Sequence, residues 1–183
     1  MQATCTDCAL RLFNNKCHNL QGIGNAWCNR VIIVPNVDYD AYKNKTMAYS
    51  SQVEVIQSHI SSTGGLESLY VLPLIRCNEQ IGCEINDDIL SKCYKYLIED
   101  FNVYKWKDVM LCGLAVNRIL GVNIKDNLNN LFVNRYNGIR FAVNYNPLVK
   151  YINNKFYSDF VAQLERWYSC SINGFYDYNI IYL

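Results

Sequence analysis

Four of the nine cysteines in this chain of 183 residues are spaced as ligands of one metal centre would be. Cys5 and Cys8 form a C-x-x-C pair near the start, and Cys77 and Cys93 follow much later. Zinc ions and iron–sulfur clusters are both held by four cysteine thiolates. If these four sulfurs meet, the N-terminal segment must lie against the body of the fold. The spacing therefore predicts a four-thiolate site that fixes the beginning of the chain to its core.

Other interpretations of the cysteines stay open. Cys83 follows Cys77 closely and competes with it for a ligand position. The chain has only two histidines, which disfavours a zinc site of the two-cysteine, two-histidine kind. No basic and apolar leader is visible, so reduced thiols are expected rather than disulfides. The alternative to a metal site is a set of unligated core cysteines, which is the expectation for Cys112 in its apolar run.

Length, charge and composition narrow the class of protein. A chain of this length fits one domain with a substantial core, and residues 1–183 are expected to form it. No apolar run is long enough to cross a membrane. The net charge of +1 gives no general attraction to nucleic acid, so any DNA contact needs a local basic patch. Many residues have AT-rich codons, and the expected location is the cytoplasm of a bacterial cell or a phage-infected host.

Short β-branched runs alternate with amphipathic stretches along the chain. The predicted strands are 30–34, 69–72, 109–112 and 139–143. The predicted helices are 51–61, 87–99 after an Asn86 cap, 114–120 and 151–168. This alternation predicts a three-layer α/β/α sandwich with a mostly parallel central sheet. The Tyr- and Ile-rich segment 172–183 is expected to pack on this domain as an added strand or to form a partner surface.

Residues that act on ligands collect where the strands of such a sheet end. Four stretches of the sequence follow or end predicted strands: Pro35-Asn36, Pro73 to Cys77, Gly113, and Asn146-Pro147. Since the carboxyl ends of parallel strands share one edge, these stretches are expected near one another.

With that layout, about residues 5–168 resemble the iron–sulfur uracil-DNA glycosylases, family 4 of the uracil-DNA glycosylase superfamily. The cysteine spacing is the specific part of the resemblance. The other matching features are Gly22-Ile23-Gly24, the strand that ends at Pro35-Asn36, the Arg76-Cys77 pair, the helix that bears Cys93, the run Leu111–Ala115 and the run Asn146–Val149.

The resemblance implies a uracil-DNA glycosylase fold and a structural 4Fe-4S cluster on Cys5, Cys8, Cys77 and Cys93, with zinc as the alternative. It also implies DNA as the partner, either uracil-containing or single-stranded. Glycosylases flip a nucleotide out of the stack and hold its base in a fitted pocket. The implied activity is excision of uracil or a related modified base by hydrolysis of the N-glycosidic bond.

Three positions depart from the family pattern. Ile33 stands where the family has a water-positioning Glu, Pro73 where it has a uracil-reading Asn, and Asn146 where it has the His before Pro. Isoleucine cannot orient water, and the proline side chain makes no hydrogen bond. The alternative function is therefore a catalytically inactive DNA-binding or replication-partner protein that keeps the scaffold.

Neighbouring polar residues are candidates to replace the missing groups. Asn36 and Asn146 are the candidate catalytic residues, because their amides can bind water or a base edge. Asp38 and Asp40 could supply a carboxylate, although a solvated loop is the favoured interpretation for both.

The remaining candidates would contact the DNA itself. Pro35, Pro73 and Tyr49 are expected to line the base pocket, with Tyr42 as an alternative stacking residue. The candidate phosphate contacts are Lys43, Lys45, Arg76 and Lys150, which would make DNA binding sensitive to salt.

Overall fold

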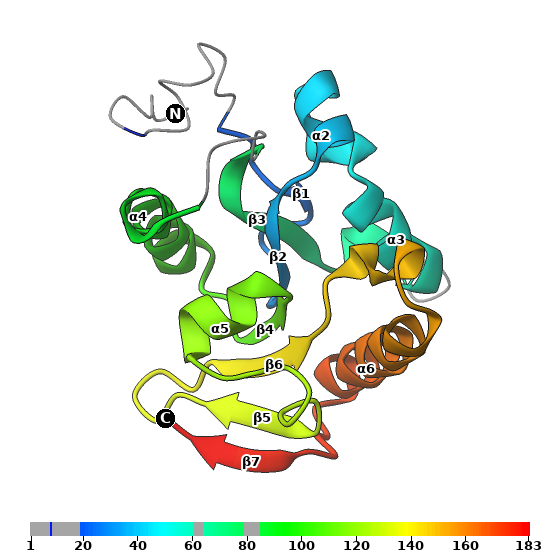
Figure 1. The fold of residues 1–183 in the computed structure, drawn as a ribbon. Helices are drawn as coiled ribbons and strands as arrows, with labels where there is room; N and C mark the ends of the chain where they lie inside the picture. The colour runs from blue at the N-terminus through cyan, green and yellow to red at the C-terminus, as the bar shows by residue number, and fades with distance from the viewer. Residues whose placement is uncertain (1–7, 9–18, 61–63, 79–84) are drawn as a thin grey trace.

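The computed structural model describes residues 8, 19–60, 64–78 and 85–183. Its centre is a seven-stranded sheet of order β1-β3-β2-β4-β6-β5-β7 (Figure 1). The strands are β1 (Ile23–Gly24), β2 (Arg30–Val37), β3 (Tyr70–Asn78), β4 (Asp108–Cys112), β5 (Asn130–Val133), β6 (Arg140–Asn144) and β7 (Asn179–Tyr182). Strands β3, β2, β4 and β6 run parallel, whereas β1 and β5 are antiparallel to β3 and β6. The predicted mostly parallel sheet is confirmed.

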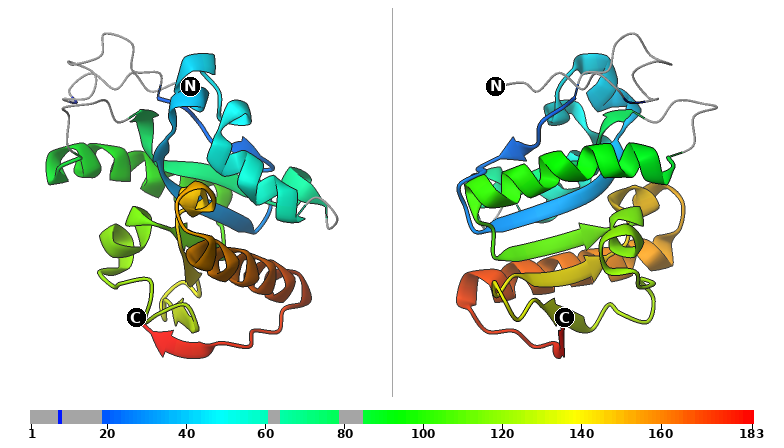
Figure 2. Two further views of the ribbon diagram at one scale, coloured as in Figure 1. Left: turned by 45° about the vertical axis from the view of Figure 1, so that its right-hand side comes forward. Right: turned by 90° about the vertical axis from the view of Figure 1, so that its left-hand side faces the viewer.

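Helices cover both faces of the sheet (Figure 2). One face carries α4 (Asp87–Tyr104) and α5 (Leu114–Leu120), and the other carries α2 (Tyr39–Asn44), α3 (Ser51–Ile60) and α6 (Asn154–Asn173). The described connections include the short 3-10 helices η1 (Met47–Tyr49), η3 (Gly65–Glu67) and η4 (Pro147–Tyr151). Neighbouring residues of β2 enter different cores, because Ile33 packs on the α4 side and Ile32 on the α6 side.

None of the helices in the described ranges is long and apolar enough to cross a membrane.

Helix ends follow local side-chain chemistry. The Asn86 side chain accepts a hydrogen bond of 3.0 Å from the Ile89 N–H, so α4 begins where the sequence predicts. Gly121, with a φ of 70°, ends α5 as predicted. Helix α6 begins later than the predicted residue 151, because Asn153 provides its N-terminal cap and the preceding residues form η4.

Strands β2 and β3 are longer than predicted, since both continue through a proline. β2 pairs with β4 only from Arg30 to Ile33, but its pairing with β3 extends to Val37. Pro35 therefore lies where β2 has a neighbour on one side only, and a missing N–H is tolerated there. The sequence did not predict β1 or β5, which are too short to give a clear pattern.

The segment after α6 returns to the sheet through a buried carboxylate. Asp108 accepts hydrogen bonds from Tyr176 Oη (2.5 Å), Arg140 Nε (2.6 Å) and Arg140 Nη2 (3.0 Å). Beyond this contact, β7 pairs in parallel with β5. Segment 172–183, expected as an added strand or a partner surface, thus contains a strand at the end of the sheet.

Tyr70→Phe is expected to reduce the loss of stability at alkaline pH. Burial, assisted by the charge of Asp100, raises the pKa of Tyr70 to about 12. The unfolded chain releases this proton near pH 10, so the free energy of unfolding falls as the pH rises from about 10 to 12, by at most about 1.4 kcal/mol per pH unit. Urea unfolding of both proteins should show this difference. A difference that stays constant between about pH 9 and about pH 12 would contradict the assignment.

Candidate functional site

The candidate site lies where the chain crosses to the other side of its first long strand. The chain passes from β2 to β3 on one side and then to β4 on the other side of β2. Ligands of open parallel sheets bind at such a reversal, outside the carboxyl ends of the strands. In this protein, that position is formed by the ends of β2 and β4, which pair in parallel.

Pro35, Gly113 and Asn146 meet at this position. Gly113 follows β4 with a φ of 56°, and a Cβ atom added to it would lie 3.0 Å from both Pro35 Cγ and Asn146 Cβ. Pro35 belongs to β2, and Asn146 follows β6. Three of the stretches that were expected at one edge are therefore in direct contact.

Gly113→Ala is expected to lower the free energy of unfolding by about 1–3 kcal/mol. The alanine would have to adopt a positive φ, and its Cβ would crowd the side chains of Pro35 and Asn146. Gly138→Ala is the matched control: its φ is 69°, but nothing lies within 4 Å of an added Cβ. The control should therefore lose less stability, because alanine at this position incurs only the cost of the backbone conformation. Thermal or urea unfolding measures both, and equal losses would show that the contact with Pro35 and Asn146 contributes nothing.

Asn36 lies beside a buried glutamine that sequence reasoning missed. The Asn36 carbonyl accepts a 2.8 Å hydrogen bond from Gln52 Nε2. Gln52 is fully buried at the start of α3, and no donor in the described residues reaches its Oε1. A buried acceptor without a donor is destabilising, so a ligand N–H placed there would be favoured. In the sequence, Gln52 looks like any polar residue of an amphipathic helix.

Asn146 caps its own turn. Its Oδ1 accepts a 3.0 Å hydrogen bond from the Leu148 N–H and so begins η4. The side-chain oxygen is therefore committed to the backbone, and the amide nitrogen is the part of Asn146 that can donate to a ligand.

The two aspartates after β2 support local structure. Asp38 caps α2 by accepting from the Ala41 N–H, and its other oxygen accepts from Ser50 Oγ (2.5 Å) and the Gln52 N–H (3.3 Å). Asp40 is exposed and accepts from Ser51 Oγ. Ile33, in the place of the family's Glu, is fully buried. Neither aspartate therefore offers an uncommitted carboxylate to the Pro35–Gly113–Asn146 contact.

Of the three predicted base-binding residues, two are buried in the core and one is exposed on the surface. Pro35 and Pro73 are buried, and Pro73 pairs with Val34 inside the sheet, so its role as a base contact is not supported. Tyr49 in η1 is 63% exposed. Tyr39 in α2 and Tyr151 in η4 are similarly exposed, and sequence reasoning missed both because the chain has fifteen tyrosines.

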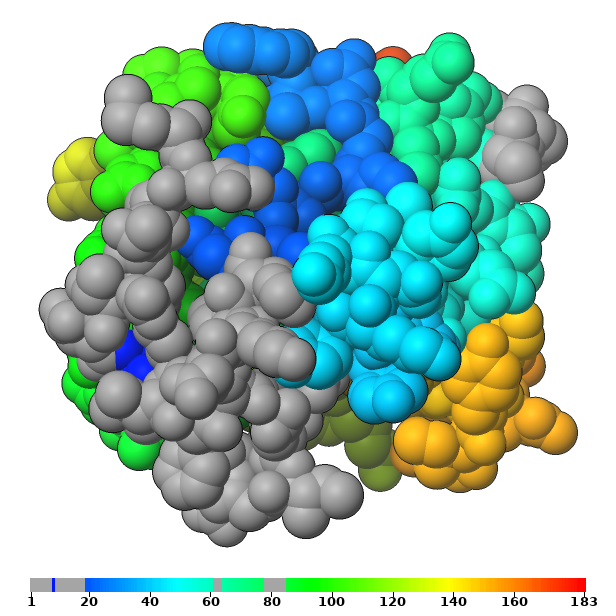
Figure 3. Space-filling model, turned by 90° about the horizontal axis from the view of Figure 1, so that it is seen from above, coloured from blue at the N-terminus to red at the C-terminus, as the bar shows by residue number. Residues whose placement is uncertain are grey.

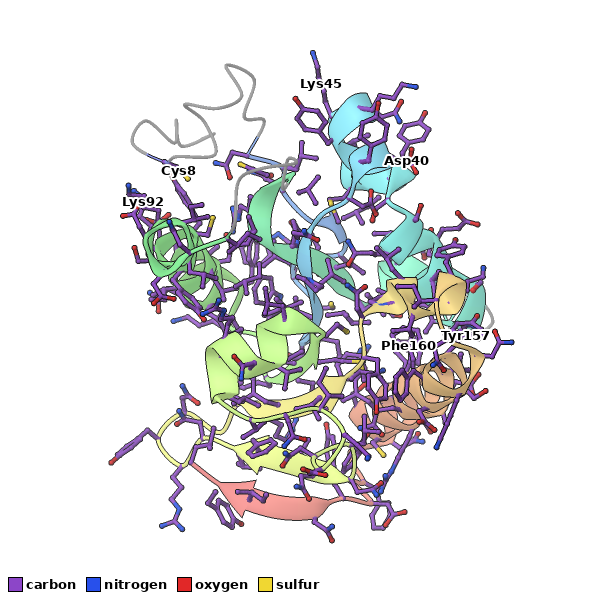
Figure 4. All side chains as sticks on the ribbon, in the orientation of Figure 1. Cys8, Asp40, Lys45, Lys92, Tyr157 and Phe160 are labelled. Atoms are coloured by element: carbon purple, nitrogen blue, oxygen red, sulfur yellow. The ribbon has the colours of Figure 1, made fainter. Side chains whose placement is uncertain are left out.

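Three of the four predicted phosphate contacts lie on the surface near these tyrosines. Lys43 and Lys45 are exposed at the end of α2, and Lys150 lies in η4 with its Nζ 5.6 Å from the centre of the Tyr151 ring. Figure 3 shows α2 and η4 on the same face of the molecule, and Figure 4 labels Lys45 at the tip of α2.

Arg76 differs from the three lysines. Its side chain is buried, its Nη2 donates to Asp100 Oδ2, and its guanidinium lies 5.4 Å from the centre of the Tyr96 ring. Burial raises the pKa of Asp100, although Arg76 opposes that shift. Because its charge is already paired on α4, the predicted contact of Arg76 with phosphate is not supported.

Three of the four predicted ligand cysteines belong to one buried cluster. Cys8, Cys77 in β3 and Cys93 in α4 are each at most 8% exposed and share a hydrophobic core. Figure 4 shows Cys8 beside α4. The Leu20 N–H donates to the Arg76 carbonyl (2.8 Å), so the chain at Leu20 lies beside β3. Residues from three separate parts of the sequence therefore contribute to the core on the α4 side of the sheet.

The chemical state of these sulfurs is mixed. Cys8 and Cys93 carry reduced thiols, and Cys77 is disulfide-bonded. Cys5 and Cys83 lie outside the described residues. Within the described part of the chain, no three His, Cys, Asp or Glu side chains are arranged to hold a metal ion. A four-thiolate site would therefore need Cys77 in its reduced form and Cys5 as a further ligand.

An apolar groove between α4 and α5 is a second feature that the sequence did not predict. Its volume is about 440 Å³, and Ile98, Phe101, Ile119 and Phe141 contribute to its walls, with Lys105 near them. The groove arises from packing between elements that are far apart in the sequence, so no local pattern indicates it.

Compared with known proteins, this chain matches no protein-family model and no curated protein.

Proposed function

We propose that this chain is a uracil-DNA glycosylase-like protein that holds a 4Fe-4S cluster and binds DNA. The observation that carries the proposal is the common burial of Cys8, Cys77 and Cys93, which come from three separate parts of the sequence. Soft thiolates gathered in an apolar environment are the donor set of iron–sulfur clusters and of structural zinc. Cys5 is the fourth ligand in this proposal, and zinc is the alternative occupant. The group would fasten the N-terminal segment to β3 and α4.

DNA binding is supported by the surface near the carboxyl ends of the strands. Lys43, Lys45 and Lys150 supply positive charge there, and Tyr49 and other exposed tyrosines supply flat rings. Lysines bind phosphates without reading sequence, and aromatic rings stack on unpaired bases. This combination fits single-stranded DNA, because its bases are free to stack.

Binding without base excision is the function that the side chains support best. Ile33 is a core residue, Asp38 is occupied by three donors, and the Asn146 oxygen caps a turn. Amide side chains hydrogen-bond well, but they do not accept a proton from water near neutral pH. The protein then belongs to the non-catalytic class of DNA-binding or replication-partner proteins.

Excision of uracil or a related base is the second candidate function. The observation that favours it is the contact of Pro35, Gly113 and Asn146, with Pro35 directly before Asn36 in β2. In this case the Asn146 amide would donate to a base oxygen, and Asn36 would help to place the water that cleaves the glycosidic bond.

Lys45→Gln is expected to weaken binding of labelled single-stranded DNA and to reduce the slope of log K against log salt by about 0.7. Lys105→Gln is the matched control: both lysines have a φ of 58° at the end of a helix, but Lys105 precedes β4 at the opposite edge of the sheet. Fluorescence anisotropy at several salt concentrations measures both. An equal loss in the two variants would contradict a DNA-binding surface at α2.

A strand-cleavage assay separates the two candidate functions. The purified protein is incubated with uracil-containing single- and double-stranded DNA and then treated with alkali, with 5-hydroxymethyluracil and hypoxanthine as further substrates. Binding without cleavage supports the non-catalytic protein. Cleavage that disappears in Asn146→Ala or Asn36→Ala, with an unchanged circular dichroism spectrum, would establish the glycosylase instead.

A further inference from the structure

Strand β7 leaves an unpaired edge at the end of the sheet. It is the last strand in the sheet order, and within the described residues it pairs with β5 alone (Figure 1). The Asn179 N–H donates to the Asn129 carbonyl (2.9 Å), and the Leu183 N–H donates to the Val133 carbonyl (3.0 Å). Because alternate residues of a strand direct their backbone groups to opposite sides, Ile180 and Tyr182 direct theirs away from β5.

The side chains of this strand are apolar and exposed. Ile180, Ile181 and Tyr182 are 52%, 37% and 57% exposed. Edge strands of monomeric proteins usually carry lysine, proline or a bulge that prevents pairing with another chain. The sequence of β7, Asn-Ile-Ile-Tyr, contains no charged residue and no proline. Such an edge is a template for a further strand.

We propose that a second copy of this chain pairs with β7 in the antiparallel direction, about a two-fold axis at Ile181. The outward-facing groups fix this register. Ile180 of one copy lies opposite Tyr182 of the other, and each of these pairs exchanges both of its backbone hydrogen bonds. Ile181 faces its own counterpart in the non-hydrogen-bonded pair between them.

The strand suits a second copy because it is complementary to itself. β7 itself carries no charged residue, and Arg135, whose guanidinium lies 5.1 Å from the centre of the Tyr182 ring, is the neighbouring charge that the dimer must accommodate. The Ile180–Tyr182 pairs combine a β-branched and an aromatic side chain, which is a favourable cross-strand combination. A two-fold contact uses the same patch on both subunits, as most homodimers do.

The dimer would join two sheets into one and direct their carboxyl edges to opposite sides. The surfaces around α2 would therefore stay accessible in both copies. Because the strand is short, the interface is expected at the small end of the range for specific contacts, with a Kd of roughly micromolar order.

Cysteine cross-linking tests the register with two neighbouring variants. In Ile181→Cys, the two Cα atoms would lie about 4.5 Å apart, which suits a disulfide. In Ile180→Cys, the two Cα atoms are diagonal to each other, about 7–8 Å apart or more, which is too far. After mild oxidation, Ile181→Cys should give reducible dimers well above the wild-type background, and Ile180→Cys should not. Background levels in both variants, or equal cross-linking, would overturn the proposal.

A proline variant tests the hydrogen bonds between the two copies without changing the pairing of β7 with β5. Ile180→Pro removes an N–H that faces away from β5, so the monomer is expected to keep its fold. Light scattering after size-exclusion chromatography should show the wild-type mass rising from 21.2 kDa toward twice that value with concentration. The variant should stay at the monomer mass. A wild-type protein that remains monomeric at about 100 µM, far above the expected Kd, would overturn the proposal, and that result leaves the DNA-binding proposal unaffected.

Discussion

Asp100→Ala is expected to lower the free energy of unfolding by about 3–5 kcal/mol, because it leaves the charge of Arg76 buried without its partner. The Arg76 side chain is only 8% exposed, and that of Asp100 is 22% exposed. The Tyr96 ring, 5.4 Å from the guanidinium, would remain as a partner worth about 1 kcal/mol. Urea unfolding followed by circular dichroism measures the loss.

A surface pair between α4 and α5 provides the control for Asp100. Asp87 binds Arg118 at 3.1 Å, but the Asp87 side chain is 94% exposed. Asp87→Ala should therefore change the free energy of unfolding by less than about 1 kcal/mol. A similarly small loss at Asp100 would show that Arg76 reaches solvent when its partner is removed, and that the corner between β3 and α4 is not rigid.

The raised pKa of Asp100 implies a further result for the same pair. Its burial opposes ionisation more strongly than Arg76 favours it. Replacing both residues together, as Arg76→Met with Asp100→Leu, should therefore cost much less stability than Asp100→Ala alone, since no charge remains to be desolvated. A double variant as unstable as the single one would contradict this explanation.

Cys93→Ser is expected to remove most of the iron that co-purifies with the protein. A serine hydroxyl is a harder and far less acidic ligand than a thiolate, so the cluster would lose one of its anchors. The N-terminal segment would then lose its attachment to α4, and limited proteolysis should remove it faster than from the wild type. Iron analysis of anaerobically purified protein measures the first effect.

Cys170→Ser is the matched control for Cys93→Ser. Both residues are buried cysteines with reduced thiols in long helices, but Cys170 lies in α6, on the other face of the sheet from α4. Its replacement should leave the iron content unchanged. Comparison of Cys77→Ser with Cys83→Ser decides which of these two neighbours is the ligand, and only the first is expected to lose iron. Equal losses at Cys93 and Cys170 would mean that iron binds without a specific site.

Local patterns predicted the elements whose ends depend on their own side chains. The Asn86 cap of α4 and the Gly121 end of α5 are such cases. The lengths of β2 and β3 could not be predicted, because they depend on which neighbour each strand has beside its proline. The same limit applies to β5, a short strand that pairs with β6 and β7, whereas an added strand was one of the two expectations for segment 172–183.

The candidate site was predictable in its position and less so in its residues. Topology alone brings Pro35, Gly113 and Asn146 to one edge, because parallel strands end together. Whether a residue can contact a base or a phosphate depends on its burial, and burial depends on tertiary packing that the sequence does not reveal. Pro73 and Arg76 are core residues, whereas Tyr151 is exposed.

The central claim is that Cys5, Cys8, Cys77 and Cys93 bind one inorganic group that joins the N-terminal segment to β3 and α4. The most direct test is metal and acid-labile sulfide analysis of the wild-type protein purified without oxygen. The account predicts about four iron and four sulfide per chain, or about one zinc if the alternative ion occupies the site. A well-folded protein that contains neither metal would contradict it.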